Sequence, residues 1–218
     1  MLRLLFEKTG NAVFISHLDL MRLFQRAFKR AGLPLTHTQG FNPRPSVSIA
    51  LPLSVGVQSR CELLDFTLDT DDVDVEKLPQ MLNEKLIPGV RVRKAYADGR
   101  KLKDLTHMAV AVRLTYDKGL PEGAVDAISH LFRKESIVVP KKGKNGIVDQ
   151  DIVPLIRKIS VESEGNQVIL NATVCCQNPT LNPTQLSAAV EMYLPELQPD
   201  VCTCERLEVY DIEEENFR

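Results

Sequence analysis

The sequence lacks the features that mark membrane proteins and nucleotide-dependent enzymes. No run of about 18 apolar residues occurs in its 218 positions, so a transmembrane helix is excluded and no membrane partner is expected. The apolar part of the opening segment, MLRLLFEKTG, is too short for a signal peptide, and the segment instead indicates a first strand. P-loop, GxGxxG and HExxH motifs are absent as well, and we therefore predict no cofactor.

The chain has few cysteines, and their number is odd. Five cysteines in a chain without an export signal indicate a reducing compartment, and the predicted location is the cytoplasm. The composition, 44% hydrophobic and 26% charged, is that of an ordinary globular protein.

Charge is segregated along the chain, although the net charge is only −2. Residues 1–60 carry eight Lys/Arg against two Asp/Glu, a net of +6, and residues 99–147 carry a net of +5. Residues 61–98 have a net of −4 and residues 148–218 a net of −9. A polyanion would therefore be bound by one face of the molecule rather than by its bulk charge.

Hydrophobic periodicity gives the same order of elements twice. In the first half, strand patterns cover 2–7, 47–51, 61–68 and 90–97, and helical patterns cover 16–31 and 72–85. In the second half, strands are expected at 108–116, 136–139, 167–176 and 204–211 and helices at 122–133 and 183–193, with an ambiguous segment at 151–164 and a basic loop, KKGKNG, at 141–146. We predict an α+β protein of two tandem ferredoxin-like (βαββαβ) domains with antiparallel sheets, at residues 1–99 and 105–212, joined near ADGRKLKDLTH.

This topology argues against a metal site. Cys175 and Cys176 would end one strand, whereas Cys202 and Cys204 would begin another, which places the two pairs at opposite ends of a sheet. A single ion needs sulfur ligands at about 2.3 Å. We therefore expect buried free thiols and no metal.

The helix expected at 16–31 has an apolar face and a basic face. Ser16 is its expected N-cap, with Asp19 as the capping-box partner. The opposite face carries four cations that suit contacts to phosphate groups: Arg22, Arg26, Lys29 and Arg30. The competing interpretation is an ordinary solvated helix face.

The segment THTQGFNPRP, residues 36–45, follows this helix and combines stiff backbone with exposed functional groups. Gly40, Pro43 and Pro45 set the path of the chain. Phe41 suits stacking on a base, and Arg44 suits pairing with a phosphate. The remaining candidates are amide and imidazole groups that suit base edges: His37, Gln39 and Asn42. The alternative is that Phe41 packs under the loop and the amides satisfy turn backbone.

Two histidines suggest a catalytic alternative, metal-independent cleavage or modification of RNA using His17 or His37. The topology opposes a shared dyad, because a helix of 16 residues is about 24 Å long and separates them. His17 at the helix N-terminus fits either an anion contact or a half-buried structural role.

Three segments carry a family resemblance: SHLDLMRLFQRAFKRAGLPL, QGFNPRPSVSIALPLSVGVQS and ELLDFTL. They closely resemble a bacterial radical SAM-associated domain family of unknown function. The residues that match the family motif are His17, Asp19, Arg22, Arg26, Gln39, Gly40, Phe41, Asn42, Pro43 and Arg44. The resemblance implies an accessory partner of a radical SAM enzyme that acts on RNA or on a ribosome-related substrate, and it assigns no catalytic residue.

These observations lead to three hypotheses about function. The first is a non-catalytic module that binds RNA, such as tRNA or ribosomal RNA, or presents it as a substrate. The second is an RNA-processing or RNA-modifying enzyme that uses His17 or His37. The third is a docking domain for a radical SAM enzyme, with Phe41 as a buried anchor.

Overall fold

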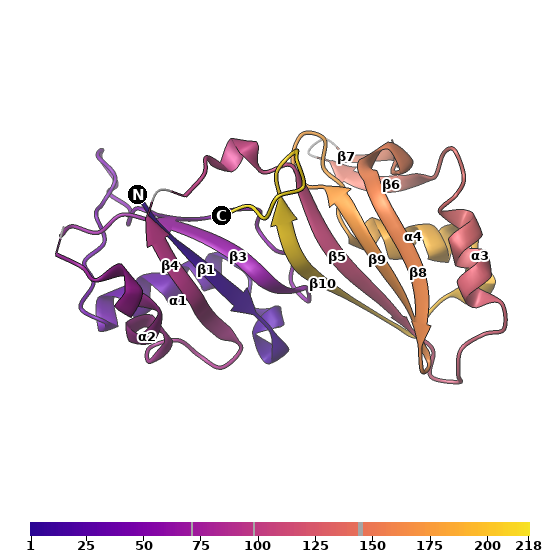
Figure 1. Cartoon of the computed structure of the whole chain (residues 1–218), viewed down its shortest axis with the longest axis horizontal. Helices are drawn as coiled ribbons and strands as arrows, with labels where there is room; N and C mark the ends of the chain where they lie inside the picture. The colour runs from indigo at the N-terminus through magenta and orange to yellow at the C-terminus, as the bar shows by residue number, and fades with distance from the viewer. Residues whose placement is uncertain (71, 98, 144–145) are drawn as a thin grey trace. The chain divides into compact units, whose positions relative to one another are not determined.

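Each half of the chain builds an antiparallel sheet with helices in the computed structural model, which describes residues 1–70, 72–97, 99–143 and 146–218 (Figure 1). The chain divides into two compact units. Unit 1 contains residues 1–104 together with 217–218, and unit 2 contains residues 105–216. The predicted α+β class with antiparallel sheets is confirmed. No helix in the described ranges is long and apolar enough to cross a membrane.

Unit 1 is built on a sheet whose strand order is β4-β1-β3, with the short β2 paired to β3. Every pairing in this sheet is antiparallel. Its elements are β1 (Leu2–Lys8), α1 (His17–Arg30), β2 (Val47–Ile49), β3 (Gln58–Phe66), α2 (Leu78–Asn83) and β4 (Val90–Ala97).

The core of unit 1 lies between this sheet and its two helices. Alternation along β1 turns Leu4 and Phe6 to the same face, where both are fully buried. The rings of Phe6 and Phe24 meet edge to face with centroids 4.8 Å apart. The apolar stripe predicted along the first helix is confirmed by its buried residues, Leu20, Phe24, Ala27 and Phe28.

A buried ion pair lies on the alternate positions of the same sheet. Arg3 of β1 stands opposite Asp65 of β3, and its guanidinium donates two hydrogen bonds to that carboxylate at 2.5 and 2.9 Å. The ring of Phe217, itself fully buried, receives cation–π contacts from Arg3 at 5.6 Å and from Arg100 at 5.4 Å. The chain therefore returns at residue 217 to complete unit 1.

Unit 2 repeats the order of elements and adds a hairpin. Its main sheet has the antiparallel order β10-β5-β9-β8. Its elements are β5 (His107–Thr115), α3 (Ala124–Leu131), β6 (Val138–Gly143), β7 (Gly146–Asp151), β8 (Ile156–Glu164), β9 (Gln167–Cys175), α4 (Thr184–Tyr193) and β10 (Val201–Tyr210).

The second helix of unit 1 is shorter than the sequence predicts. Instead of one helix over 72–85, a 3₁₀ turn at Val75–Lys77 precedes α2. Pro79 explains the break, because it has no N–H to donate to the carbonyl of residue 75 and therefore cannot lie in the interior of an α-helix that begins at residue 72. Asp74 caps the 3₁₀ turn by accepting a hydrogen bond from the Glu76 N–H at 3.1 Å.

The basic loop predicted at 141–146 is largely a hairpin. Strands β6 and β7 pair from Val138 opposite Asp151 to Gly143 opposite Gly146. Lys144 and Asn145, which belong to that predicted loop, lie outside the described residues. The ambiguous segment at 151–164 is mostly strand β8, preceded by a short 3₁₀ turn at Val153–Leu155.

Candidate nucleic-acid interface

The N-terminus of α1 is capped as the sequence predicts. The Asp19 N–H donates to Ser16 Oγ at 3.2 Å, and the Ser16 hydroxyl donates to Asp19 Oδ2 at 2.8 Å. Arg22 then donates to Asp19 Oδ1 at 2.9 Å. The Ser16 hydroxyl and the Arg22 guanidinium together lower the pKa of Asp19. Arg22 is therefore already paired within the first turns of the helix.

The four predicted cations of α1 fall into two groups. Arg22 is paired with Asp19, and Arg30 donates to the carbonyl oxygen of Lys85 at 2.8 Å. Arg26 and Lys29 are exposed and, within the described ranges, make no hydrogen bond or ion pair. Phosphate contacts would displace no protein partner from Arg26 or Lys29, so these two are the cations most available to a polyanion.

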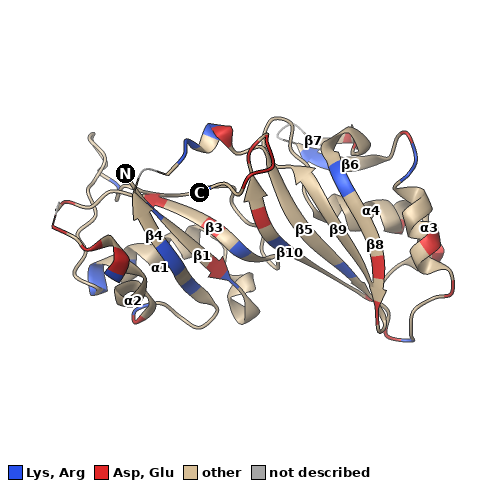
Figure 2. Ribbon diagram, viewed as in Figure 1, with Lys and Arg blue, Asp and Glu red and all other residues tan. Residues whose placement is uncertain are grey.

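Basic residues that the sequence analysis did not select lie on β4. Arg91, Arg93 and Lys94 are exposed on this strand, where blue bands interrupt the ribbon (Figure 2). Arg93 is paired with Glu7 at 2.8 Å. The acidic net charge of residues 61–98 concealed this strand, because a sum over a segment does not resolve which residues share a face.

The segment after α1 forms an edge of the sheet in two separate pieces. Leu35 bridges Leu68, and Val47 at the start of β2 pairs with Phe66. Both pieces therefore lie against the same strand and its continuation. The chain leaves this edge at residue 37 and rejoins it after residue 45, and we call residues 37–45 the excursion.

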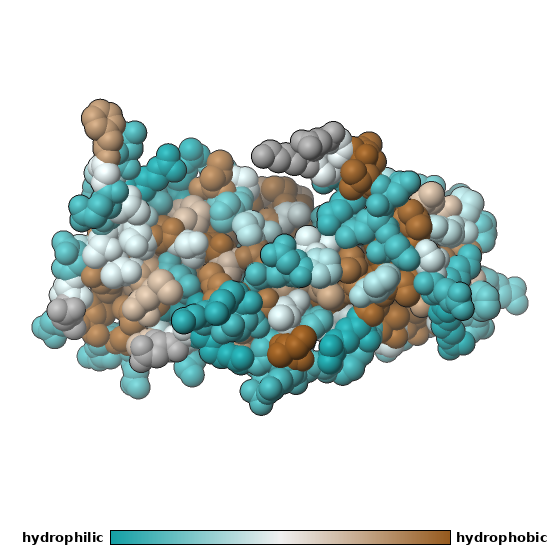
Figure 3. All heavy atoms as spheres, turned by 90° about the horizontal axis from the view of Figure 1, so that it is seen from above, coloured by the Kyte–Doolittle hydropathy of each residue, from teal (hydrophilic) through white to brown (hydrophobic). Residues whose placement is uncertain are grey.

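Hydrogen bonds close the base of the excursion. His37 and Pro45 form an isolated antiparallel bridge. The Thr38 N–H donates to the Arg44 carbonyl at 2.8 Å, and the Arg44 N–H donates to Thr38 Oγ1 at 3.0 Å. A base closed in this way holds the tip away from the body of unit 1, where a narrow projection is visible (Figure 3).

The tip of the excursion offers its side chains to solvent. Phe41 is 99% exposed, the highest value among the large apolar residues described. Gly40 has a φ of 137°, which side chains other than hydrogen rarely allow. Gln39, Asn42 and the Arg44 side chain are also exposed, so the structure contradicts the alternative in which Phe41 packs beneath the loop.

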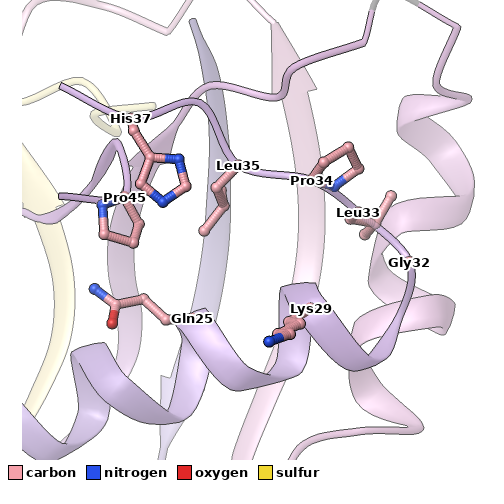
Figure 4. Close-up of a pocket in the computed structure, with 8 residues that line it drawn as sticks. All are labelled: Gln25, Lys29, Gly32, Leu33, Pro34, Leu35, His37 and Pro45. Carbon is pink, nitrogen blue, oxygen red and sulfur yellow. The ribbon is translucent and has the colours of Figure 1, made fainter. Parts of the chain in front are cut away.

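A cavity of about 530 Å³ lies between α1 and the base of the excursion (Figure 4). It is lined by Gln25 and Lys29 of α1, by the turn Gly32–Leu35, and by His37 and Pro45. Of these residues, only Lys29 and His37 are among the candidates that the sequence predicts. Gln25 had a detectable signal, since it lies three residues after Arg22 and four before Lys29 on the same helical face.

His17 and His37 do not share a site. His17 is the first residue of α1, and Gln25 lies eight residues further along the same helix. His37 lies across the cavity from Gln25 (Figure 4). Eight residues correspond to about 12 Å along a helix axis, far beyond hydrogen-bond reach. The arrangement therefore favours two separate roles over an acid–base dyad.

The cysteines of unit 2 lie on or next to β9 and β10, the two strands that flank β5. Cys175 stands opposite His107 at one end of that strand, and Cys202 stands opposite Leu114 near the other. Burial raises the pKa of Cys176 and of Cys204 to about 12, which keeps both as thiols. Across the described parts of the chain, no three His, Cys, Asp or Glu side chains gather in a geometry that would hold a metal.

Comparison with known proteins identifies the family of this chain. Residues 1–183 match the family model described as an uncharacterized protein conserved in bacteria, DUF2344, and the chain belongs to this family. The part of the resemblance that concerns an uncharacterized bacterial family is confirmed. No curated protein matches the chain.

Solved structures with a similar course of the chain come from ribonucleoprotein complexes. A chain of a Cbf5–Nop10–Gar1 complex matches with a TM-score of 0.48 and 10% identity, over 95% of this chain and 48% of the other. A chain of an archaeal box H/ACA Nop10–Cbf5 complex matches with a TM-score of 0.47 and 9% identity, over 94% and 46%. This chain thus spans about half the length of those proteins, and likenesses at this level assign it no function.

Proposed function

We propose that this member of the DUF2344 family is a non-catalytic module that binds single-stranded RNA or presents it to another protein, using α1 and the excursion of unit 1. The observation that carries the proposal is the 99% exposure of Phe41 on a projection of the unit that also carries Arg26 and Lys29, two cations that make no hydrogen bond or ion pair in the described ranges. Aromatic rings on which bases stack, next to positive charge that follows the backbone, are the usual means of binding single strands.

The division of labour follows from the chemistry of each group. Arg26, Lys29 and Arg44 would contact phosphates, and Phe41 would stack on an unpaired base. Gln39 and Asn42 would hydrogen bond to base edges. Arg22 and Arg30 would add long-range attraction while keeping their partners, Asp19 and the Lys85 carbonyl.

Salt-dependent binding of a short single-stranded RNA tests this proposal. We expect each lost phosphate contact to reduce the slope of log K against log salt by about 0.7. The variant Arg26→Glu/Arg44→Glu should therefore lose more than about tenfold in affinity and about 1.4 in slope. Lys118→Glu/Arg133→Glu, which reverses two exposed charges in unit 2, is the matched control. Equal affinity for the double variant and the control would refute the proposal.

A radical SAM enzyme is the second candidate partner, and it would bind to a different surface of unit 1. Phe14 and Leu18, at the N-terminal end of α1, are 72% and 66% exposed. Exposed apolar side chains of this size suit a protein interface. Phe14→Ser/Leu18→Ser should abolish co-elution with a radical SAM enzyme of the same cell and leave RNA binding intact. Co-elution that survives this change would exclude these residues as the docking surface.

The finer architecture and the location belong to the same proposal. The order β4-β1-β3-β2 in unit 1 and the order β10-β5-β9-β8 in unit 2, with all neighbours antiparallel, support a ferredoxin-like fold for each. Unit 2 would then be a ferredoxin-like domain with an inserted hairpin. Five free cysteines suit a cytoplasmic protein.

A further inference from the structure

The cavity beside α1 combines apolar walls with a lysine at its rim. Leu33, Pro34, Leu35 and Pro45 form the walls, and Lys29 and His37 stand at the rim. None of the described residues that line it is acidic. A volume of about 530 Å³ falls within the range of ligand pockets, roughly 300–1,000 Å³. The site therefore suits a ring-shaped ligand that carries negative charge.

Gln25 gives this cavity a means of reading its ligand. Its side chain is half-buried and projects from α1 toward the side of the cavity occupied by Pro45 and His37 (Figure 4). Within the described ranges its amide makes no hydrogen bond. A glutamine amide presents a donor and an acceptor side by side, and this pair matches the adjacent amino group and ring nitrogen of adenine.

Lys29 lies four residues after Gln25, so both side chains emerge on the same face of α1. A base held by Gln25 would place its sugar and phosphate near the rim, where the Lys29 ammonium is without a protein partner in the described parts of the chain. The excursion starts and ends at this rim, through His37 and Pro45. A strand stacked on Phe41 could therefore deliver the neighbouring nucleotide to the cavity.

We propose that the cavity binds one unpaired purine of the RNA, with adenine preferred, a subsite that rests on the proposed RNA-binding function. The apolar walls enclose the base, Gln25 hydrogen bonds to its edge, and Lys29 contacts the adjoining phosphate. Phe41 and the Arg26 and Arg44 pair supply affinity without base preference, whereas Gln25 supplies the preference at this subsite.

Titration of the full chain with mononucleotides tests the subsite directly. The probes are AMP, UMP and ribose 5-phosphate, and the readout is the NMR signals of the Leu33 and Leu35 methyl groups. We expect AMP to shift these signals saturably and more strongly than UMP, and ribose 5-phosphate to leave them unchanged. Gln25→Leu, which keeps the volume and removes the amide, should weaken AMP binding by about fivefold or more. Gln198→Leu, an exposed glutamine of unit 2, should bind AMP as the unchanged protein does.

The outcomes separate this inference from the function beneath it. Absence of AMP shifts at Leu33 and Leu35, or equal AMP binding by Gln25→Leu and Gln198→Leu, overturns the purine subsite even if RNA binding depends on Arg26 and Arg44. AMP binding that is lost in Gln25→Leu supports the subsite. If RNA affinity is then indifferent to Arg26→Glu/Arg44→Glu, the RNA grip fails and the subsite stands.

Discussion

Both units carry an extra segment at the same topological place, between the first helix and the second strand, but the two segments differ in form. In unit 1 it is the excursion of residues 37–45, which has no strand and only a closed base. In unit 2 it is the β6–β7 hairpin, paired along its length. The hairpin pairs its two strands with each other, whereas the excursion has no ladder beyond its closed base and leaves its exposed side chains open to a partner.

Proline and glycine explain the difference. Pro43 and Pro45 have no N–H to donate, and Gly40 adopts a φ of 137° that a regular strand does not use. A ladder cannot propagate through that sequence. The hairpin of unit 2 contains a proline as well, Pro140, but pairs around it with Asp149 opposite. The same place in the order of elements therefore carries a paired hairpin in unit 2 and a segment without strands in unit 1.

The helices that precede these segments, α1 and α3, differ in the charge of their exposed residues. The exposed residues of α1 include Arg26 and Lys29, without protein partners in the described ranges. The exposed residues of the shorter α3 include Asp126 and His130. Charge and loop conformation thus favour the same unit as the binding surface.

The largest expected effect concerns the buried pair of unit 1. Arg3→Met leaves Asp65 buried without its cation and should lower the free energy of unfolding by about 3–5 kcal/mol in urea titrations. The double variant Arg3→Met/Asp65→Leu, which removes both charges, should recover most of that loss. A double variant as unstable as the single one would contradict this account.

Thiol labelling sharpens the same comparison, because buried cysteines report on each unit. Cys61 belongs to unit 1, and Cys176 and Cys204 belong to unit 2. In Arg3→Met at intermediate urea, Cys61 should react with iodoacetamide before the other two, as measured by mass spectrometry. Simultaneous reaction of all three would mean that the units unfold together.

The next effect concerns Phe41 of the excursion and Ile147 of the hairpin. Phe41→Ala should weaken binding of single-stranded RNA by about 1–3 kcal/mol, the usual value for a lost base–aromatic stack. Its thermal midpoint should be unchanged, because the ring is 99% exposed. Ile147→Ala, in the hairpin of unit 2 and 76% exposed, is the matched control. An equal loss for both variants would show that the two residues do not differ in function.

A smaller effect separates the two first helices. Ser16→Ala removes the N-cap of α1 and should cost about 1 kcal/mol of stability, whereas Ser16→Thr should keep most of it. The N-cap of α3 is instead Gly123, which has a φ of 72° and makes no side-chain cap. Circular dichroism during urea unfolding measures the change, and equal stability of Ser16→Ala and Ser16→Thr would exclude a capping role.

The smallest effect is a pH dependence at the same cap. Because the Ser16 hydroxyl and Arg22 lower the pKa of Asp19, its folded pKa lies below the unfolded value of about 3.9. The stability it contributes is present above that value and is lost as pH falls through the folded pKa. Asp19→Asn should therefore be less stable than the unchanged protein near pH 7, and the difference should disappear as the pH falls below the folded pKa, as urea midpoints would show. A gap that persists at low pH would contradict this assignment.

Much of unit 1 could be predicted from the sequence because its patterns are local. The 3.6-residue period of Leu20, Phe24 and Phe28 is sufficient to locate α1, and Ser16 marks its start. The last strand, β4, was predicted with the bounds that it has in the structure. The start of α2 differs from the predicted start because Pro79 interrupts the α-helical hydrogen bonds of the turn before it.

The candidate site was predicted in part, and the remainder depended on long-range contacts. The cations of α1 and the side chains of the excursion were visible in the sequence. The cavity was not, because Leu33 and Leu35 line it only after residue 35 has bridged residue 68. The hydrogen bond of Arg30 could not be predicted either, because its acceptor is the carbonyl of Lys85, 55 residues away in the sequence.

The sequence by itself determined the α+β class, the basic face of the first helix and the stiff, donor-rich segment that follows it. These properties are set by periodicity and by the φ limits of glycine and proline, which act over a few residues. Three further features depend on tertiary contacts: which cations remain available, the projection of Phe41 into solvent, and the position of Gln25 and Lys29 at a cavity. Those outcomes depend on strand pairing between distant residues, which places side chains together that no local pattern connects.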